Sequence, residues 1–500
     1  MNHLFSKKDI WALVWPLMIE QLLAITLGIA DIIMVATLGE TAVSGVSLVD
    51  SIFIFINQLF AALATGGAVV CSQYIGKGSP EFASKTAKQL LISVFFSATA
   101  VAIIGFVSMN ALLDALFGNV EAAVMENART YFFWMLVGLP SIAVYNACAA
   151  LFRAQRNSRI SMFTGFVINV LNIGGNAIML YGLHCGVEGV AIPTFIARTT
   201  AAVILLVLLY EPRHKQRAVF SAPRDENTAR RAENSVREEE RPAEHDERPV
   251  PRADNPGGRA APRPVPRADQ IISIKGILRT KPDFYLIKKI LQIGVPNGLE
   301  NSMFQLGKIL VITLVATFGT GAIAANAASN TVSSFQVLPA SSIGLALLTV
   351  VGQCMGAKRS DEAIYYTKRM MAAAYISMAA LNVPLLLSAR WLIGFYGMSP
   401  ETTELGWRML MCHGITGIIF WPASFTLPNA LRAANDARYT MIVSLITMWT
   451  VRVGLSYVYA NTFGMGAFGV WVAMSTDWVF RGLFFVIRFK SGKWKNRELV

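Results

Sequence analysis

The sequence predicts an all-α polytopic membrane protein with twelve transmembrane helices in two six-helix lobes, related as a parallel repeat. Three observations lead to this fold class. The chain of 500 residues is 54% apolar and only 15% charged, with a mean hydropathy of +0.48. Its apolar runs are about 20 residues long, which is the length of a helix that crosses a bilayer. The second half of the chain repeats the first half.

The spans follow from the apolar runs and the polar segments between them. The runs lack the alternating pattern of a membrane barrel, and a helix satisfies its own backbone hydrogen bonds in lipid, so every span is expected to be helical. The expected spans are residues 11–36, 45–71, 89–113, 130–152, 160–182, 187–210, 287–317, 322–355, 368–392, 407–431, 440–460 and 467–488.

The basic residues predict the orientation of the chain. The net charge of +13 lies mainly in alternate loops and in the tail KSGKWKNR, whereas the loops between them are poor in Lys and Arg. By the positive-inside rule, both termini face the cytoplasm from a cell (inner) membrane. The charge therefore reflects topology and argues against nucleic-acid binding. No cleavable signal peptide is evident, and five scattered cysteines predict neither a disulfide framework nor a metal site.

The two halves align at one nearly constant offset, which is the offset that places Pro16 on Pro296. The other matched positions include Glu20 with Glu300, Gln73 with Gln353, Gly76 with Gly356 and Arg153 with Arg432. Because each half has an even number of spans, the copies share one orientation and are related by an axis along the membrane normal. Two such bundles can move against each other around a central cavity, which favours a transporter.

A segment rich in Pro, Arg and Glu separates the halves. It has no apolar period and few aromatic residues, a composition that cannot bury enough surface to fold. We therefore expect an amino-terminal lobe over residues 1–210, a disordered cytoplasmic linker over 211–283 and a carboxyl-terminal lobe over 284–500.

The first span carries two carboxylates, Glu20 and Asp31. They are eleven residues apart, so they lie on one helix face, within about 20° of each other. An ionisable residue inside a span is a candidate for function because charge is costly there. The copies differ at these sites. Asp31 corresponds to Val311, Asp50 to Asn330, and Lys308 to Gly28, so the acidic site belongs to the amino-terminal half.

Four segments resemble the multidrug and toxic compound extrusion (MATE) family of secondary transporters. They are WPLMIEQLLAITLGIADIIMVATLG in the first span, QYIGKGSPEFASK after the second, LFRAQRNSR after the fourth and PNALRAANDARYTMI after the tenth. The resemblance covers both lobes but not the linker, which is longer than the family usually has.

The resemblance implies an antiporter that expels amphipathic, often cationic organic compounds from a V-shaped cavity, driven by inward movement of H⁺ or Na⁺ and without a cofactor. Asp31 matches the family's first-helix aspartate, and Pro16 matches a proline at which that helix bends in some members. Asn172 and Asn176 lie where many members have Asn and Asp, so one anionic ligand for Na⁺ is missing. Glu300 matches a glutamate of another branch, whose acidic partner in the tenth span is absent from this sequence.

We assign candidate roles on these grounds. The cation-coupling candidates are Asp31, Asn172, Asn176 and Glu300, and Na⁺ is a candidate ligand of the first three because it favours oxygen ligands. The candidates for substrate binding are Asp50, Glu20, Asn169 and Trp421. For Asp50, structural pairing is an equal alternative. Trp421 precedes two prolines that interrupt the tenth span, which indicates either a cavity lining or a packing kink. Asp477, Arg481 and Arg452 are expected to form an internal ion-pair cluster.

Three alternatives to an antiporter remain open from the sequence. An enzyme is disfavoured because no nucleophile motif, metal-ligand spacing or phosphate loop is present in a suitable context. A flippase or exporter of lipid-linked or saccharide substrates shares the lobe design but is expected to have a more cationic cavity. A scaffold would use the linker as its interaction arm. We expect a monomer in the lipid bilayer that binds small organic substrates.

Overall fold

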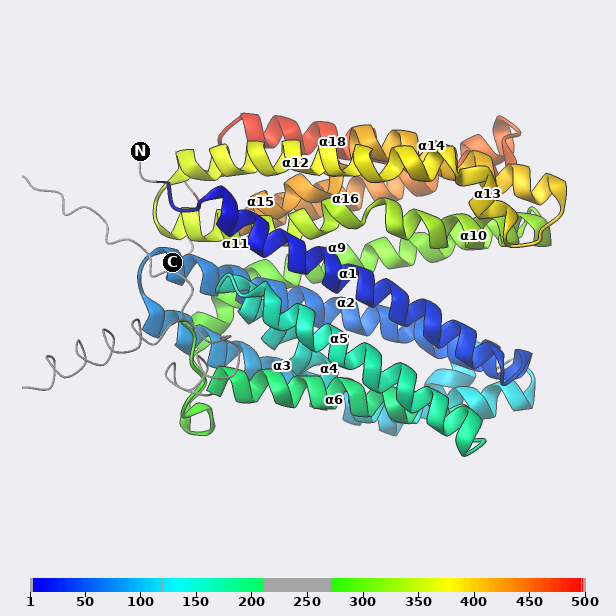
Figure 1. The fold of residues 1–500 in the computed structure, drawn as a ribbon, viewed down its shortest axis with the longest axis horizontal. Helices are drawn as coiled ribbons and strands as arrows, with labels where there is room; N and C mark the ends of the chain where they lie inside the picture. The colour runs from blue at the N-terminus through cyan, green and yellow to red at the C-terminus, as the bar shows by residue number, and fades with distance from the viewer. Residues whose placement is uncertain (1–2, 119, 211–270, 496, 498–500) are drawn as a thin grey trace, which may run out of the picture.

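The computed structural model describes residues 3–118, 120–210, 271–495 and 497, and this part of the chain forms two side-by-side helical bundles (Figure 1). The first contains α1 (Lys7–Ala36), α2 (Glu40–Gly76), α3 (Pro80–Phe117), α4 (Ala122–Ala154), α5 (Ser158–Ala177) and α6 (Glu188–Tyr210). A π-helical turn, Ile178–Gly182, extends α5. Helix α1 runs through Pro16 without interruption.

The second bundle has more helical segments because several spans are broken. It contains α9 (Phe284–Ala316), α10 (Thr320–Gln336), α11 (Leu338–Gly356), α12 (Ser360–Leu387), α13 (Ala389–Gly394), α14 (Pro400–Trp421), α15 (Leu427–Ala433), α16 (Ala437–Ile446), α17 (Leu455–Tyr457) and α18 (Gly466–Lys490). Twelve segments of the described residues are long and apolar enough to cross a membrane, and none of these residues forms a strand. The predicted all-α, twelve-span fold is confirmed.

Four expected spans are interrupted in the second bundle, including the span expected over 368–392, which divides at Ser388. The span expected over 322–355 divides at Val337, because Pro339 lacks an N–H and its ring crowds the carbonyl four residues earlier. The tenth span contains one π-helical segment, Pro422–Thr426, which begins at the first of its two prolines, whereas Pro428 lies in the regular helix α15. The eleventh span also has two π-helical segments, Thr447–Gly454 and Val458–Thr462, which the sequence analysis does not predict.

The last part of the expected linker is ordered, contrary to the expectation for residues 211–283. The backbone N–H groups of Ile271 and Ile272 donate to Oε1 of Gln155 at 3.0 and 3.1 Å, and Ile272 is buried. The isoleucines of this segment supply the apolar surface that the preceding sequence lacks. Residues 211–270 lie outside the described residues, so the prediction of disorder is untested there.

Helix α1 begins and α18 ends at the same end of the molecule, here called the terminal end (Figure 1). At this end α2 and α11 cross between the bundles in matched contacts. Gln73 Nε2 donates to the Ala433 carbonyl at 2.7 Å, and Gln353 Nε2 donates to the Ala154 carbonyl at 2.8 Å. Each glutamine thus bonds the end of a helix in the other bundle, so the repeat extends to the contact between the halves.

Two glycines allow this crossing to be close. A Cβ on Gly76 would overlap the Gln353 carbonyl, and a Cβ on Gly356 would overlap the Gln73 carbonyl. Because the obstacle is backbone in both cases, no side-chain rotation relieves it. The terminal end of the bundle interface therefore requires glycine at both positions.

Replacing Gly76 by Ala is expected to separate the bundles at the terminal end. The thiol of Cys354, which is buried beside Gln353, should then react with a maleimide several times faster, as measured by peptide mass spectrometry. Gly174→Ala is the matched control, because its added Cβ meets no atom within 4 Å. Equal Cys354 labelling in the two variants would contradict the expected role of Gly76.

Candidate functional site

Asp31 lies in a hydrogen-bonded chain that joins three helices of the first bundle. Asn176 on α5 donates through Nδ2 to Asp31 Oδ1 at 2.9 Å and to Asn172 Oδ1 at 3.2 Å. Asn172 donates in turn to Thr194 Oγ1 on α6 at 2.7 Å. The structure therefore brings together Asp31, Asn172 and Asn176, as the sequence analysis expected, and adds Thr194 to them.

Two amide oxygens on α5 could accept further hydrogen bonds or bind a cation. Oδ1 of Asn176 is buried and has no hydrogen-bond partner among the described residues, and the same holds for Oδ1 of Asn169, which lies on the same helix. The amide of Asn169 donates to its own helix, at the Gly165 carbonyl, so this residue does not contact Asp31 in the structure. Buried acceptors of this kind are normally satisfied, so the arrangement suits a proton or a small cation near Asp31.

Asp50 belongs to the same electrostatic group as Asp31, although it lies on α2. Its carboxylate accepts a hydrogen bond from the Tyr131 hydroxyl of α4 at 3.3 Å. Arg198 of α6 interacts electrostatically with both carboxylates, and its Nε is buried without a hydrogen-bond partner among the described residues. We call Asp31, Asp50 and Arg198, with the amide of Asn176 that contacts Asp31, the acidic site. Its two carboxylates and one guanidinium give a formal charge of one negative unit.

Glu20 does not join this group, although it shares a helix face with Asp31. Its Oε1 accepts from Arg153 Nη1 of α4 at 2.8 Å, and its Oε2 accepts from the Ser161 hydroxyl of α5 at 2.6 Å. Both oxygens are therefore satisfied by contacts that tie α1 to α4 and α5.

Glu300 contacts an arginine and a serine in the second bundle as Glu20 does in the first, but through one oxygen, and its buried Oε2 has no hydrogen-bond partner among the described residues. Arg432 Nη2 donates to its Oε1 at 2.6 Å, and the Ser444 hydroxyl donates to the same oxygen at 2.7 Å. Both the glutamate and the arginine are matched between the halves, so the repeat reproduces a complete ion pair within this chain. Glu300 can bind a coupling ion only after its ion pair with Arg432 opens, because the guanidinium already neutralises its charge.

The remaining predicted residues lie together in the second bundle. Trp421 stacks on Phe425, with ring centroids 5.0 Å apart, at the start of the π-helical segment. Arg481 and Asp477 of α18 are buried and form an ion pair at 3.4 Å, as expected for i, i+4 neighbours. Arg452 completes the expected cluster through its electrostatic interaction with Asp477.

Several contributing residues were not predicted. Thr194, Tyr131 and Arg198 take their places through helix packing, and a single sequence gives no direct indication of that packing. A usable indication existed for Arg153 and Arg432. Each half carries a glutamate and an arginine at nearly the same separation, and a pair repeated in both copies suggests a contact.

A known protein family matches each half of the chain separately. The MatE family model matches residues 16–178 and again 296–458, two matches that begin at the paired prolines of the two halves and together span more than half of the chain. The chain belongs to the MATE family of transporters. This MATE protein is therefore a multi-pass membrane transporter and not an enzyme.

Curated relatives cover nearly the whole MATE chain. An uncharacterized transporter, YisQ, from Bacillus subtilis is 24% identical over 98% of this chain and 96% of its own length. A probable multidrug resistance protein, NorM, from Thermotoga maritima is 22% identical over 99% of this chain and 94% of its own length. Both relatives are thus similar to this chain over nearly its whole length.

A solved structure shows the same fold. A MOP superfamily transporter from Pyrococcus furiosus, whose binding pocket is described as having reversed polarity, superposes with a TM-score of 0.81. The identity is 18%, over 98% of this chain and 97% of the other. At this identity the match supports the MATE fold alone.

Proposed function

We propose that the protein exports amphipathic, often cationic organic compounds by alternating access, in exchange for H⁺ or Na⁺. The observation that carries this proposal is the acidic site, in which Asp31 contacts Asn176 and shares Arg198 with Asp50. We place the protein as a monomer in the cell (inner, cytoplasmic) membrane with both termini in the cytoplasm. The match of both halves to the MatE model supports an exporter over the lipid-linked saccharide flippase.

The charge of the acidic site supplies a mechanism for exchange. Its single excess negative charge is neutralised either by the coupling ion or by a cationic substrate. Holding both at once leaves uncompensated positive charge in a poorly solvated site, which is costly. The two therefore compete, and each leaves the site when the other enters from the opposite side of the membrane.

Individual residues take distinct parts in this proposal. Asp31 is the principal coupling carboxylate, Asn172 and Asn176 hold the ion or the protonated acid, and Glu300 is a second coupling residue when it separates from Arg432. Asp50, Asn169 and Trp421 contact the substrate. Glu20 contributes only if substrate entry separates it from Arg153.

Separate ion gradients in proteoliposomes test the proposal. Efflux of ethidium is measured under a Na⁺ gradient alone and under a pH gradient alone, and protein-free vesicles report leakage. We expect one gradient to drive efflux well above leakage. Movement under neither gradient would reject ion-coupled export.

The variant Asn176→Asp is expected to shift coupling toward Na⁺. It places a second carboxylate next to Asp31, and an added anionic oxygen strengthens Na⁺ binding. Half-maximal efflux should occur at a Na⁺ concentration about tenfold lower, which corresponds to about 1.4 kcal/mol. The control is Asn461→Asp, which adds the same charge at an exposed position of the other bundle that does not line the cavity described below. An unchanged Na⁺ dependence in Asn176→Asp would remove Asn176 from the ion site.

A further inference from the structure

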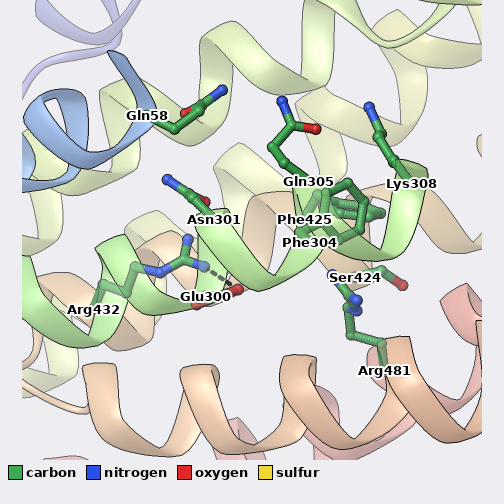
Figure 2. A pocket seen from close by; sticks show the side chains of 10 residues that line it. All are labelled: Gln58, Glu300, Asn301, Phe304, Gln305, Lys308, Ser424, Phe425, Arg432 and Arg481. Atoms are coloured by element: carbon green, nitrogen blue, oxygen red, sulfur yellow. Dashed lines mark hydrogen bonds and ion pairs between the residues drawn. The ribbon is translucent and has the colours of Figure 1, made fainter. Parts of the chain in front are cut away.

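A cavity in the second bundle lies beside the first. Its volume is about 260 Å³, and it is lined by residues of α9, α15, α18 and the π-helical segment Pro422–Thr426, with Gln58 facing them from α2 (Figure 2). The cavity therefore borders the contact region of the two bundles. The predicted substrate residue Trp421 does not line the cavity but stacks on Phe425, which does.

The charge of this cavity is opposite to that of the acidic site. Glu300 is the one carboxylate among its lining residues, and Arg432 pairs with it at 2.6 Å. Arg481, also in the lining, is 3.4 Å from the buried carboxylate of Asp477. Lys308 also lines the cavity and is exposed, and no carboxylate pairs with it among the described residues. Positive charge therefore remains after the ion pairs are counted.

Arg452 adds to this excess from just behind the lining. It is buried, its Nε has no hydrogen-bond partner among the described residues, and it shares Asp477 with Arg481. Lys308, Arg432, Arg452 and Arg481 face two carboxylates, so the cluster carries a formal charge of two positive units. A ligand with an anionic group would satisfy donors that are otherwise unused.

An aromatic platform lies at the centre of the cations. The ring centroid of Phe304 is 5.3 Å from Lys308 Nζ, 5.2 Å from Arg452 Cζ and 5.4 Å from Arg481 Cζ. Phe425 meets Phe304 edge to face, with centroids 6.1 Å apart. Both rings line the cavity, and ring surface next to cations suits a ligand whose own ring bears the acid group.

The repeat places this cavity where the first bundle has Glu20 and Arg153, which correspond to the lining residues Glu300 and Arg432. At the offset that places Pro16 on Pro296, three further positions correspond: Gly28 to Lys308, Asp31 to Val311 and Asn172 to Arg452. The second half has a cation in place of Gly28 and in place of Asn172, and it lacks the carboxylate of Asp31. At these positions the second half is therefore more positive than the first.

We propose that this cavity binds the carboxylate or sulfonate of an aromatic organic compound, with the ring against Phe304 and the acid group between Lys308 and Arg481. The ligand class therefore includes organic anions, and zwitterions whose cationic group reaches the acidic site of the first bundle. The proposal rests on the proposed export function only in taking the ligand to be a transported compound.

Equilibrium binding to the full-length protein in a nonionic detergent tests this assignment. The probes are a fluorescent diethylaminocoumarin carboxylic acid and its ethyl ester, which share the ring and differ in one negative charge. Fluorescence polarisation should show at least about tenfold tighter binding of the acid than of the ester, the size expected for a charge-assisted hydrogen bond. No ion gradient is present, so failure of coupled export does not affect the result.

The variant Lys308→Met assigns the site. Acid binding should weaken about tenfold or more while ester binding changes little, and Lys308→Arg should retain the preference. Lys308 is exposed in the cavity, so its replacement leaves no buried group unpaired. Lys368→Met removes the same charge from an exposed position of α12 that does not line the cavity, and it should bind like the parent.

Two outcomes would overturn the assignment. Equal affinity of acid and ester in the parent protein would remove the anion site, whether or not export is ion-coupled. Displacement of the probe by farnesyl pyrophosphate at a lower concentration than by a non-fluorescent coumarin acid would replace the aromatic acid with an isoprenoid pyrophosphate.

Discussion

Ion-driven efflux is expected to fall to the level of protein-free vesicles when Asp31 is replaced by Asn. Asparagine keeps the shape and can still accept the hydrogen bond from Asn176, but it removes the charge that holds the coupling ion. Losing such a partner in a poorly solvated site costs about 3 kcal/mol, or about a hundredfold in ion affinity. Gradient-driven ethidium efflux in proteoliposomes measures the effect.

A matched variant separates coupling from folding. Asp361→Asn makes the same substitution at a carboxylate whose side chain is 96% exposed at the start of α12, and it should transport like the parent. Asp31→Asn should elute from size exclusion as a single species, since its hydrogen bond is retained. Near-normal gradient-dependent efflux from Asp31→Asn would exclude Asp31 from the mechanism.

Arg432→Met is expected to cause the largest loss of stability among single replacements in the second bundle. It leaves the carboxylate of Glu300, only 7% exposed, without its guanidinium. Breaking a buried pair from one side typically costs about 3–5 kcal/mol. Because membrane proteins of this size often unfold irreversibly, the temperature at which half of the monodisperse species is lost in detergent is the suitable measure.

The double variant Glu300→Gln with Arg432→Met provides the decisive comparison. Removing both charges should recover most of the lost stability, since no buried charge is then unpaired. Arg408→Met is the surface control, because Arg408 pairs with Glu404 at 3.1 Å while 62% exposed, and such pairs contribute about 0–1 kcal/mol. If Arg432→Met loses no more than Arg408→Met, the buried pair has no structural importance.

The repeat explains why much of the fold was predictable. Apolar runs set the spans, and the constant offset between the halves showed that Glu20 and Glu300 occupy one place in two copies of the same bundle. The partners were harder to predict. Whether Arg153 reaches Glu20 depends on how α4 rotates against α1, and no local pattern encodes that rotation.

The acidic site was predictable only in part for a related reason. The resemblance placed Asp31, Asn172 and Asn176, and the structure joins them. Arg198 belongs to the acidic site because it interacts electrostatically with Asp31 and Asp50. No sequence pattern indicates that α6 brings it close to them. Similarly, the π-helical segment Thr447–Gly454 contains no proline, so neither propensity nor periodicity marks it.

The ordered residues just before α9 attach the start of the second bundle to α3 of the first. Gln89 of α3 donates to the Lys281 carbonyl at 2.8 Å and accepts from the Asp283 N–H at 3.1 Å, directly before α9 begins. The first turn of α9 is thereby clamped to the first bundle. If the two bundles rotate against each other, the start of α9 stays fixed to the first bundle. The helix then bends further along, at Pro296, which lacks a backbone N–H donor. The position of the start of α9 against the first bundle is therefore set by residues 281 and 283 themselves.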